Sequence, residues 1–147
     1  MAHIAGRIRI AAPVETVFDR VADSRHEPAY NPAMKDVEKL TPGPVGLGTR
    51  FRAHMGRGGS PMLVELTGFD RPHRLASVTT GALMQTSGAL TFTEDGADTM
   101  MSWDWDVRPK GWLRALGPAF GPLGNRMERR IWGGLKRHLE EGTGSTA

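Results

Sequence analysis

Histidine is the side chain best suited to proton transfer near neutral pH, and the histidine candidates for a buried site are His54 and His73. In the stretch RFRAHM, an extended chain places Phe51 and Ala53 on one face and His54 on the other. His73 follows Pro72 in a predicted turn. We therefore expect both imidazoles on the outer surface, which argues against a catalytic role for either.

Glu65, Tyr30 and Gln85 are further polar candidates for a buried site. Glu65 follows Val64 in a predicted strand and points outward if Val64 is buried. In the opposite register Glu65 would be a buried carboxylate, with Arg52 on the neighbouring strand as its expected partner. Tyr30 offers an apolar ring and one hydroxyl, which suits a pocket rim, and ordinary packing accounts for it equally well. These residues leave the catalytic group unknown.

Metal and cofactor sites have little support in the sequence. No two histidines have the spacing of zinc ligands, since they stand at His3, His26, His54, His73 and His138. The chain contains 0 cysteines, which excludes disulfides, thiolate metal sites and thiol catalysis. The stretch GRGGS lacks the strand-to-helix context of a phosphate-binding loop. We expect neither a metal nor a cofactor.

Composition predicts a single soluble domain. The chain has 147 residues, of which 39% are hydrophobic and 24% charged, with a net charge of +3. The basic residues near the C-terminal end are not interleaved with aromatic residues, which favours a solvated helix face over a nucleic-acid site. No apolar run reaches the roughly 20 residues of a membrane helix, and no signal-peptide pattern is present. We expect a cytoplasmic monomer or homodimer without an integral membrane segment.

Hydrophobic periodicity predicts a strand, a short helix pair, six more strands and a long C-terminal helix. The first strand lies within 2–10, the helix pair with the loop that ends it within 12–34, the later strands between 34 and 109, and the helix within 110–141. Pro118 and Pro122 should kink or delay the first turns of that helix. Residues 1–141 are therefore expected to form one domain, with residues 142–147 as a flexible tail.

The stretch MMSWDWDV is the most polarised strand of the sequence. Side chains alternate between the two faces of a strand, so Trp103 and Trp105 share one face and Asp104 and Asp106 the other. The C-terminal helix is the only predicted element long and apolar enough to cover the tryptophans. We expect them to lie beneath that helix, either packed directly against it or across a gap.

A ligand held in that gap would contact the inward residues of the strands and the inner stripe of the helix. Methionines suit such a site because flexible thioethers adapt to irregular apolar surfaces, and core filling explains them equally well. Met127 is expected on the inner stripe, opposite the two tryptophans. The candidate ligand-binding residues are Tyr30, Phe51, Met55, Met62, Met84, Trp103, Trp105, Phe120, Met127 and Ile131.

Several motifs in order along the chain resemble the START-related SRPBCC superfamily, in its polyketide cyclase/dehydrase or lipid-transport-like branch. They are IRIAAPVETVFDRVAD, YNPAM, GLGTRF, LVELTGFDRPHRLA and VRPKGWL, and together they span nearly the whole chain. The resemblance implies an α+β helix-grip fold, in which a curved antiparallel sheet of about seven strands wraps around the C-terminal helix. It also implies a hydrophobic cavity between the two. No catalytic residue set is common to the superfamily, so the resemblance gives none here.

Three functions remain open from the sequence. The first is binding of a hydrophobic small molecule, such as a lipid, sterol or aromatic polyketide. The second is a polyketide cyclase or aromatase, which would need an ionisable group inside the same cavity. The third is an interaction module without ligand, which an apolar patch lacking a concave pocket would favour.

Overall fold

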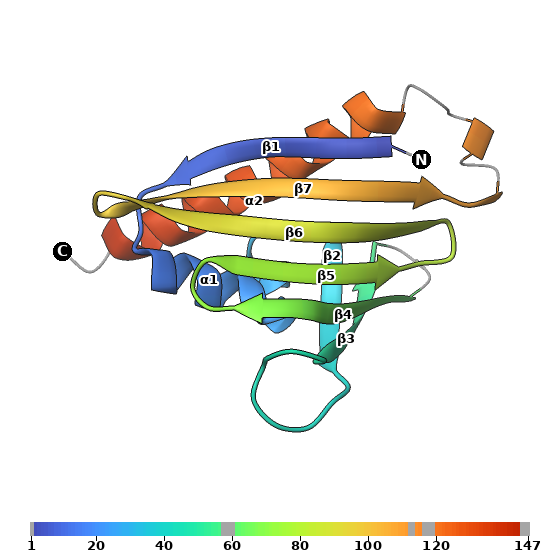
Figure 1. The fold of residues 1–147 in the computed structure, drawn as a ribbon, viewed down its shortest axis with the longest axis horizontal. Coiled ribbons are helices and arrows are strands. Elements are labelled where there is room, and N and C mark those ends of the chain that lie inside the picture. Colours follow the sequence, from blue (N-terminus) through green and yellow to red (C-terminus); the bar gives the residue numbers. More distant parts are fainter. Residues whose placement is uncertain (1, 57–60, 112–113, 116–119, 145–147) are drawn as a thin grey trace.

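The computed structural model describes residues 2–56, 61–111, 114–115 and 120–144. Strand β1 (Ala2–Ile10) leads into helix α1 (Val14–Ala22) and the 3₁₀ helix η1 (Ser24–Ala29). The strands β2 (Met34–Lys39), β3 (Arg50–Met55), β4 (Pro61–Asp70), β5 (Arg74–Thr80), β6 (Met84–Asp95) and β7 (Asp98–Pro109) follow. Helix α2 (Phe120–Gly144) ends the described chain (Figure 1).

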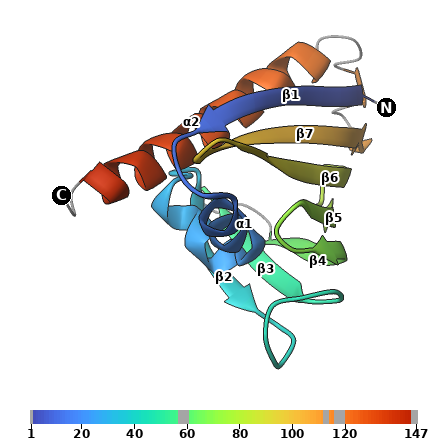
Figure 2. The same ribbon diagram turned by 60° about the vertical axis from the view of Figure 1, so that its left-hand side comes forward.

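All seven strands form one sheet in the order β1-β7-β6-β5-β4-β3-β2, and every neighbouring pair is antiparallel. The first and second strands of the chain therefore occupy opposite edges, and α1 and η1 connect them. Figure 2 shows the strands arranged in an arc with α1, η1 and α2 on its inner side. This arrangement confirms the predicted curved antiparallel sheet and long C-terminal helix.

The alternation of β7 is as predicted. Its inward side chains are buried, namely Met101, Trp103, Trp105 and Val107. The outward Asp104 and Asp106 are exposed, and both lie within ion-pair distance of His3 on β1, at 3.3 and 3.1 Å. One face of the strand is therefore part of the core, and the other is solvated.

Each β7 indole lies over a glycine of a neighbouring strand. Gly6 of β1 is opposite Trp103, and a Cβ at Gly6 would overlap the indole of Trp103. Gly88 of β6 is opposite Trp105, and a Cβ there would overlap the carbonyl oxygen of Asp104. Glycine is therefore needed at both positions to leave room for the strand and its large rings.

Helix α1 closes one end of the arc with an apolar face. Its inward residues Val14, Val17, Phe18 and Val21 are buried, at the spacing read from the sequence. Phe18 makes edge-to-face contacts with Phe69 and Phe92, with ring centroids 5.2 and 5.3 Å apart. The helix thereby fixes the start of η1, which follows after Asp23.

The expectation for Met127 is wrong, because α2 presents a different face to the sheet. Met127 is 50% exposed, whereas Leu135 and Leu139 are 0% and 5% exposed. A helix turns by about 100° per residue, so four-residue steps drift by about 40° each. Between Leu139 and Met127 this drift amounts to about 120°, which carries Met127 away from the core.

Glycines allow the inner face of α2 to approach its neighbours closely. A Cβ at Gly134 would overlap the carbonyl oxygen of Tyr30, and a Cβ at Gly124 would overlap the side chain of Ile4. Helix α2 continues to Gly144, into the segment expected to be a tail, and residues 145–147 lie outside the described residues. Among the described residues, no helix is long and apolar enough to cross a membrane.

Candidate functional site

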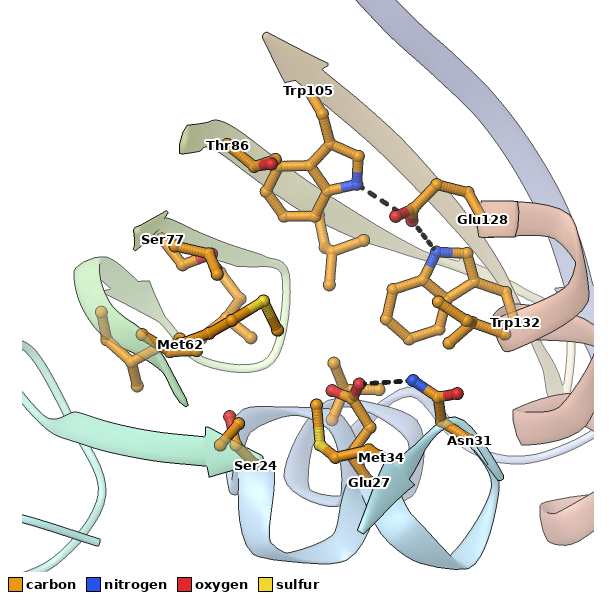
Figure 3. Close-up of a pocket in the computed structure, with 18 of the residues that line it drawn as sticks. Ser24, Glu27, Asn31, Met34, Met62, Ser77, Thr86, Trp105, Glu128 and Trp132 are labelled. Atoms are coloured by element: carbon orange, nitrogen blue, oxygen red, sulfur yellow. Dashed lines mark hydrogen bonds between the residues drawn. The ribbon is translucent and has the colours of Figure 1, made fainter. Parts of the chain in front are cut away.

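A cavity of about 230 Å³ lies on the inner side of the sheet, between the strands and the helices (Figure 3). Strands β2 to β7 and helices α1, η1 and α2 all contribute to its wall. Most lining residues are apolar or carry a small hydroxyl group. They are Val21, Ser24, Glu27, Asn31, Met34, Ala53, Met62, Val64, Leu66, Leu75, Ser77, Thr79, Met84, Thr86, Leu90, Trp105, Glu128, Ile131 and Trp132.

The strand side of the wall follows from alternation along the central strands. On β4 the lining residues are Met62, Val64 and Leu66, and on β5 they include Ser77 and Thr79. These are every second residue, as expected for one face of a pleated sheet. The hydroxyl-bearing and smaller side chains on β5 leave space that larger apolar residues would fill.

The helix side of the wall carries a carboxyl group held by two indoles. The Nε1–H groups of Trp105 and Trp132 both donate to Oε2 of Glu128, at 3.1 and 2.6 Å. Trp132 lies one helical turn after Glu128 on α2, whereas Trp105 comes from the sheet. Burial raises the pKa of Glu128, and the two indole hydrogen bonds act in the opposite direction. The carboxyl is thus fixed in position at the sheet–helix boundary.

A second carboxyl group enters the cavity from η1. Nδ2 of Asn31 donates to Oε2 of Glu27 at 2.9 Å, and Oδ1 of Asn31 accepts from the backbone N–H of Ala33. Asn31 therefore orients Glu27 while it also closes the turn that follows η1. Burial raises the pKa of Glu27 to about 7, the Asn31 hydrogen bond opposes this shift, and the charge of Glu128 adds to it.

The two carboxyl groups have no basic partner in the described part of the chain: no ion pair there involves either Glu27 or Glu128. Their recorded side-chain donors are Asn31 for Glu27 and the two indoles for Glu128. A carboxyl group with a pKa of about 7 can both accept and release a proton near neutral pH. The site can therefore bind hydrogen-bond donors or take part in proton transfer.

The structure brings only some of the predicted site residues to the cavity. Met62, Met84, Trp105 and Ile131 line it. Phe51, Trp103 and Tyr30 are buried in the core but lie outside the lining, and Met127 is half-exposed. The side chains of Met55 and Phe120 lie outside the described residues.

His54, His73 and Glu65 lie on the surface in ion pairs, whereas Gln85 is half-buried on β6 and lies outside the cavity lining. His54 pairs with Asp36 at 2.7 Å, His73 with Glu94 at 2.8 Å, and both histidine side chains are about half exposed. Glu65 points outward and pairs with Arg50 at 3.3 Å, not with Arg52. Tyr30 is buried, its hydroxyl has no partner in the described part of the chain, and burial raises its pKa well above the ordinary value.

Glu27, Glu128 and Trp132 were missed by the sequence reasoning. Glu128 stands among Arg126, Arg129 and Arg130, a composition typical of a solvated helix face. One signal was present: Glu128 precedes Trp132 by one helical turn, and Trp132 itself lies close to Leu135 on the same side of the helix. Three turns of 3.6 residues amount to about eleven residues, so the residue on the same face three turns before Leu139 is Glu128 and not Met127.

Among the described residues, no three histidine or acidic side chains are grouped so that they could hold a metal ion. The cavity is therefore described by its apolar wall, its carboxyl groups and their amide and indole donors.

Solved structures share this fold over most of the chain. A START superfamily protein from Mycobacterium smegmatis is 18% identical, with 100% of both chains covered and a TM-score of 0.74. A protein from Thermus thermophilus, TTHA0849, is 17% identical, with 95% of this chain and 98% of that chain covered and a TM-score of 0.76. DynU16, a protein of the dynemicin biosynthetic locus, is 19% identical with a TM-score of 0.74. The match covers 97% of this chain but 48% of DynU16, so this chain spans about half of its length.

No curated protein sequence matches the chain. The sequence model of the family described as polyketide cyclase / dehydrase and lipid transport matches residues 1–140. That match covers nearly the whole chain, and the fold is that of START-related proteins. The chain therefore belongs to the polyketide cyclase/dehydrase and lipid transport family.

Proposed function

We propose that the protein binds a small hydrophobic molecule in the cavity between the sheet and α2. The observation that carries this proposal is a largely apolar cavity of about 230 Å³ whose carboxyl and amide groups are those of Glu27, Asn31 and Glu128. Apolar walls with a few placed polar groups are typical of small-molecule sites. Since a cavity of about 150 Å³ accommodates benzene, this one suits a ligand of roughly ten non-hydrogen atoms.

The experiment is a titration of the ¹⁵N-labelled protein with 2-phenylethanol, followed by NMR. Binding should shift the indole N–H signals of Trp105 and Trp132 and the backbone signals of Ser77 and Thr79. The variant Ser77→Leu should abolish these shifts because its side chain fills the cavity. The matched control is Thr80→Leu, on the same strand but exposed, which should bind as the wild type does. Equal binding by wild type and a folded Ser77→Leu variant would contradict the proposed location.

A second candidate function is acid–base catalysis, and the raised pKa of Glu27 favours it. A carboxyl group that titrates at about pH 7 could remove a proton next to a ketone and later protonate the departing hydroxyl. Ring closure of a short polyketone follows that course: a carbon–carbon bond forms, one water is lost and an aromatic ring results.

The test substrate for this second function is heptane-2,4,6-trione, which has a suitable size and gives 3,5-dihydroxytoluene and water on cyclisation. Product formation would be followed by chromatography with wild type and with Glu27→Gln. If the protein is a catalyst, wild type should convert the trione faster than buffer alone does. Glu27→Gln should lose most of this rate enhancement. If the trione is converted no faster with the protein than in buffer alone, the catalytic function is contradicted and ligand binding remains the proposed function.

A further inference from the structure

The carboxyl groups of Glu27 and Glu128 are unusual for an apolar cavity, because both come from the helix side and neither has a basic partner among the described residues. Figure 3 shows both side chains pointing toward the cavity, Glu27 from η1 and Glu128 from α2. A buried carboxylate is costly unless hydrogen bonds or an opposite charge compensate it. The described residues provide hydrogen bonds to the two carboxyl groups but no opposite charge.

The hydrogen bonds that the protein provides leave one oxygen of each carboxyl group available. Asn31 donates to Oε2 of Glu27, and the indoles of Trp105 and Trp132 both donate to Oε2 of Glu128. In the described part of the chain, no side-chain or backbone donor is recorded for Oε1 of either residue. Each carboxyl group could therefore accept a further N–H hydrogen bond from a ligand in the cavity.

Two basic residues close in sequence to the glutamates are directed elsewhere. The guanidinium group of Arg129, next to Glu128, lies 5.7 Å from the ring centroid of Trp103, which does not line the cavity. Arg25, close to Glu27, forms a bidentate pair with Asp23, from Nε to Oδ1 and from Nη2 to Oδ2. Since no described basic residue pairs with either glutamate, we expect a positive charge at this site to come with the ligand.

The aromatic rings beside Glu128 also suit a cation. Trp105 and Trp132 line the cavity, and indole faces attract ammonium groups more strongly than other aromatic side chains do. The same rings and the apolar strand residues would contact the uncharged part of the ligand. An anionic ligand, by contrast, would be repelled by both carboxylates.

We propose that the ligand carries a protonated amine on a small apolar body, with the ammonium group bound between Glu27 and Glu128. This inference rests on the proposed binding function and specifies the chemical class of its ligand. The raised pKa values of both glutamates agree with it, because a site built for a cation is electrostatically unfavourable while it is empty.

The experiment compares three ligands of nearly equal shape: 2-phenylethylamine, 2-phenylethanol and ethylbenzene. Their affinities are measured at pH 8 by NMR titration of the indole N–H signals of Trp105 and Trp132. The amine is protonated at this pH, as a lysine side chain is. We expect the amine to bind at least about tenfold more tightly than the alcohol, because charge-assisted hydrogen bonds are stronger than neutral ones.

Glutamine variants identify the groups responsible for this preference. Glu128→Gln and Glu27→Gln keep the shape of the side chain but remove its charge, and each should reduce the preference for amine over alcohol several-fold. The matched control is Glu15→Gln, an exposed position on α1, which should leave the preference unchanged. The dispersion of the NMR spectrum shows whether each variant is folded. If one glutamine variant does not fold, the other still tests the inference.

The outcomes separate the inference from the function on which it rests. If alcohol and amine bind equally, or if the preference for amine persists in both glutamine variants, the amine inference is overturned while cavity binding stands. If none of the three ligands shifts the cavity signals, the proposed binding function fails, and the inference fails with it.

Discussion

The indole of Trp105 on β7 donates to the carboxyl of Glu128 on α2 at 3.1 Å and thereby joins the sheet to the helix across the edge of the cavity. Trp132 donates to the same oxygen at 2.6 Å, so two large rings are held by one carboxyl group. Trp103, the other inward indole of β7, is buried, and its Nε1–H has no partner among the described residues. The two tryptophans of the WDW stretch therefore differ: one packs in the core, and the other belongs to the cavity.

This difference predicts a pH-dependent effect of removing an indole N–H. Trp132→Phe should destabilise the protein more at pH 8 than at pH 5, by about 1–2 kcal/mol between the two, because the lost bond goes to the charged form of Glu128. Trp103→Phe is the control, since its N–H makes no bond with a described residue and its cost should not change with pH. Urea unfolding at both pH values measures the difference. The same pH dependence in both variants would contradict the role of the Trp132 bond.

Glu27 should make the protein less stable as the pH rises. The pKa of Glu27 is raised from 4.5 to about 7, so below pH 4.5 both the folded and the unfolded states hold the proton. Between 4.5 and 7 the unfolded chain releases its proton first, and the free energy of unfolding should fall by up to about 3 kcal/mol. Above this range the contribution is constant. The groups facing Glu27 are Asn31 and Glu128, together with the neutral hydroxyl of Tyr30.

Glu27→Gln should remove this pH dependence. The variant should be more stable than wild type at about pH 8 and similar to it at about pH 4, as measured by urea unfolding. Glu15→Gln is exposed on α1 and should follow the wild-type curve. A Glu27→Gln variant that is less stable than wild type at pH 8 would mean that the charged carboxylate has a favourable partner after all.

The sheet and the inward face of β7 could be predicted because the pattern is local. Alternation of Trp103 and Trp105 with acidic residues determines which face of the strand is buried, whatever the rest of the chain does. The glutamates could not be found in this way. The environment of Glu27 depends on Asn31 and on α2, and that of Glu128 depends on an indole from the sheet. Such tertiary partners leave no periodic signal in the sequence.

Two substitutions can test which face of α2 packs against the sheet. Leu135→Ala should cost about 2–5 kcal/mol of stability because it removes a fully buried side chain. Met127→Ala should change stability by less than about 0.5 kcal/mol because Met127 is half-exposed. Thermal or urea unfolding gives both values. Comparable losses at the two positions would restore the original expectation that Met127 faces the sheet.

Adjacent glycines on α2 provide the sharpest test of how closely the helix packs on the segment that carries Glu27 and Asn31. A Cβ at Gly134 would overlap the backbone carbonyl oxygen of Tyr30, which cannot move without shifting the turn after η1. At Gly133 the nearest atom to a Cβ is Nη1 of Arg137, at 3.8 Å, an ordinary contact. Both positions lie within the same helix, so their intrinsic helix preferences are alike.

Gly133→Ala should therefore stabilise the protein by about 0.5–1 kcal/mol, the usual gain of alanine over glycine in a helix. Gly134→Ala should instead destabilise it by about 1–3 kcal/mol, since overpacking outweighs that gain. Displacement of α2 from Tyr30 would also move Glu128 relative to Glu27, so Gly134→Ala should weaken ligand binding, whereas Gly133→Ala should not. Stabilisation by both substitutions would mean that α2 lies farther from Tyr30, and the two carboxyl groups farther apart, than the structure places them.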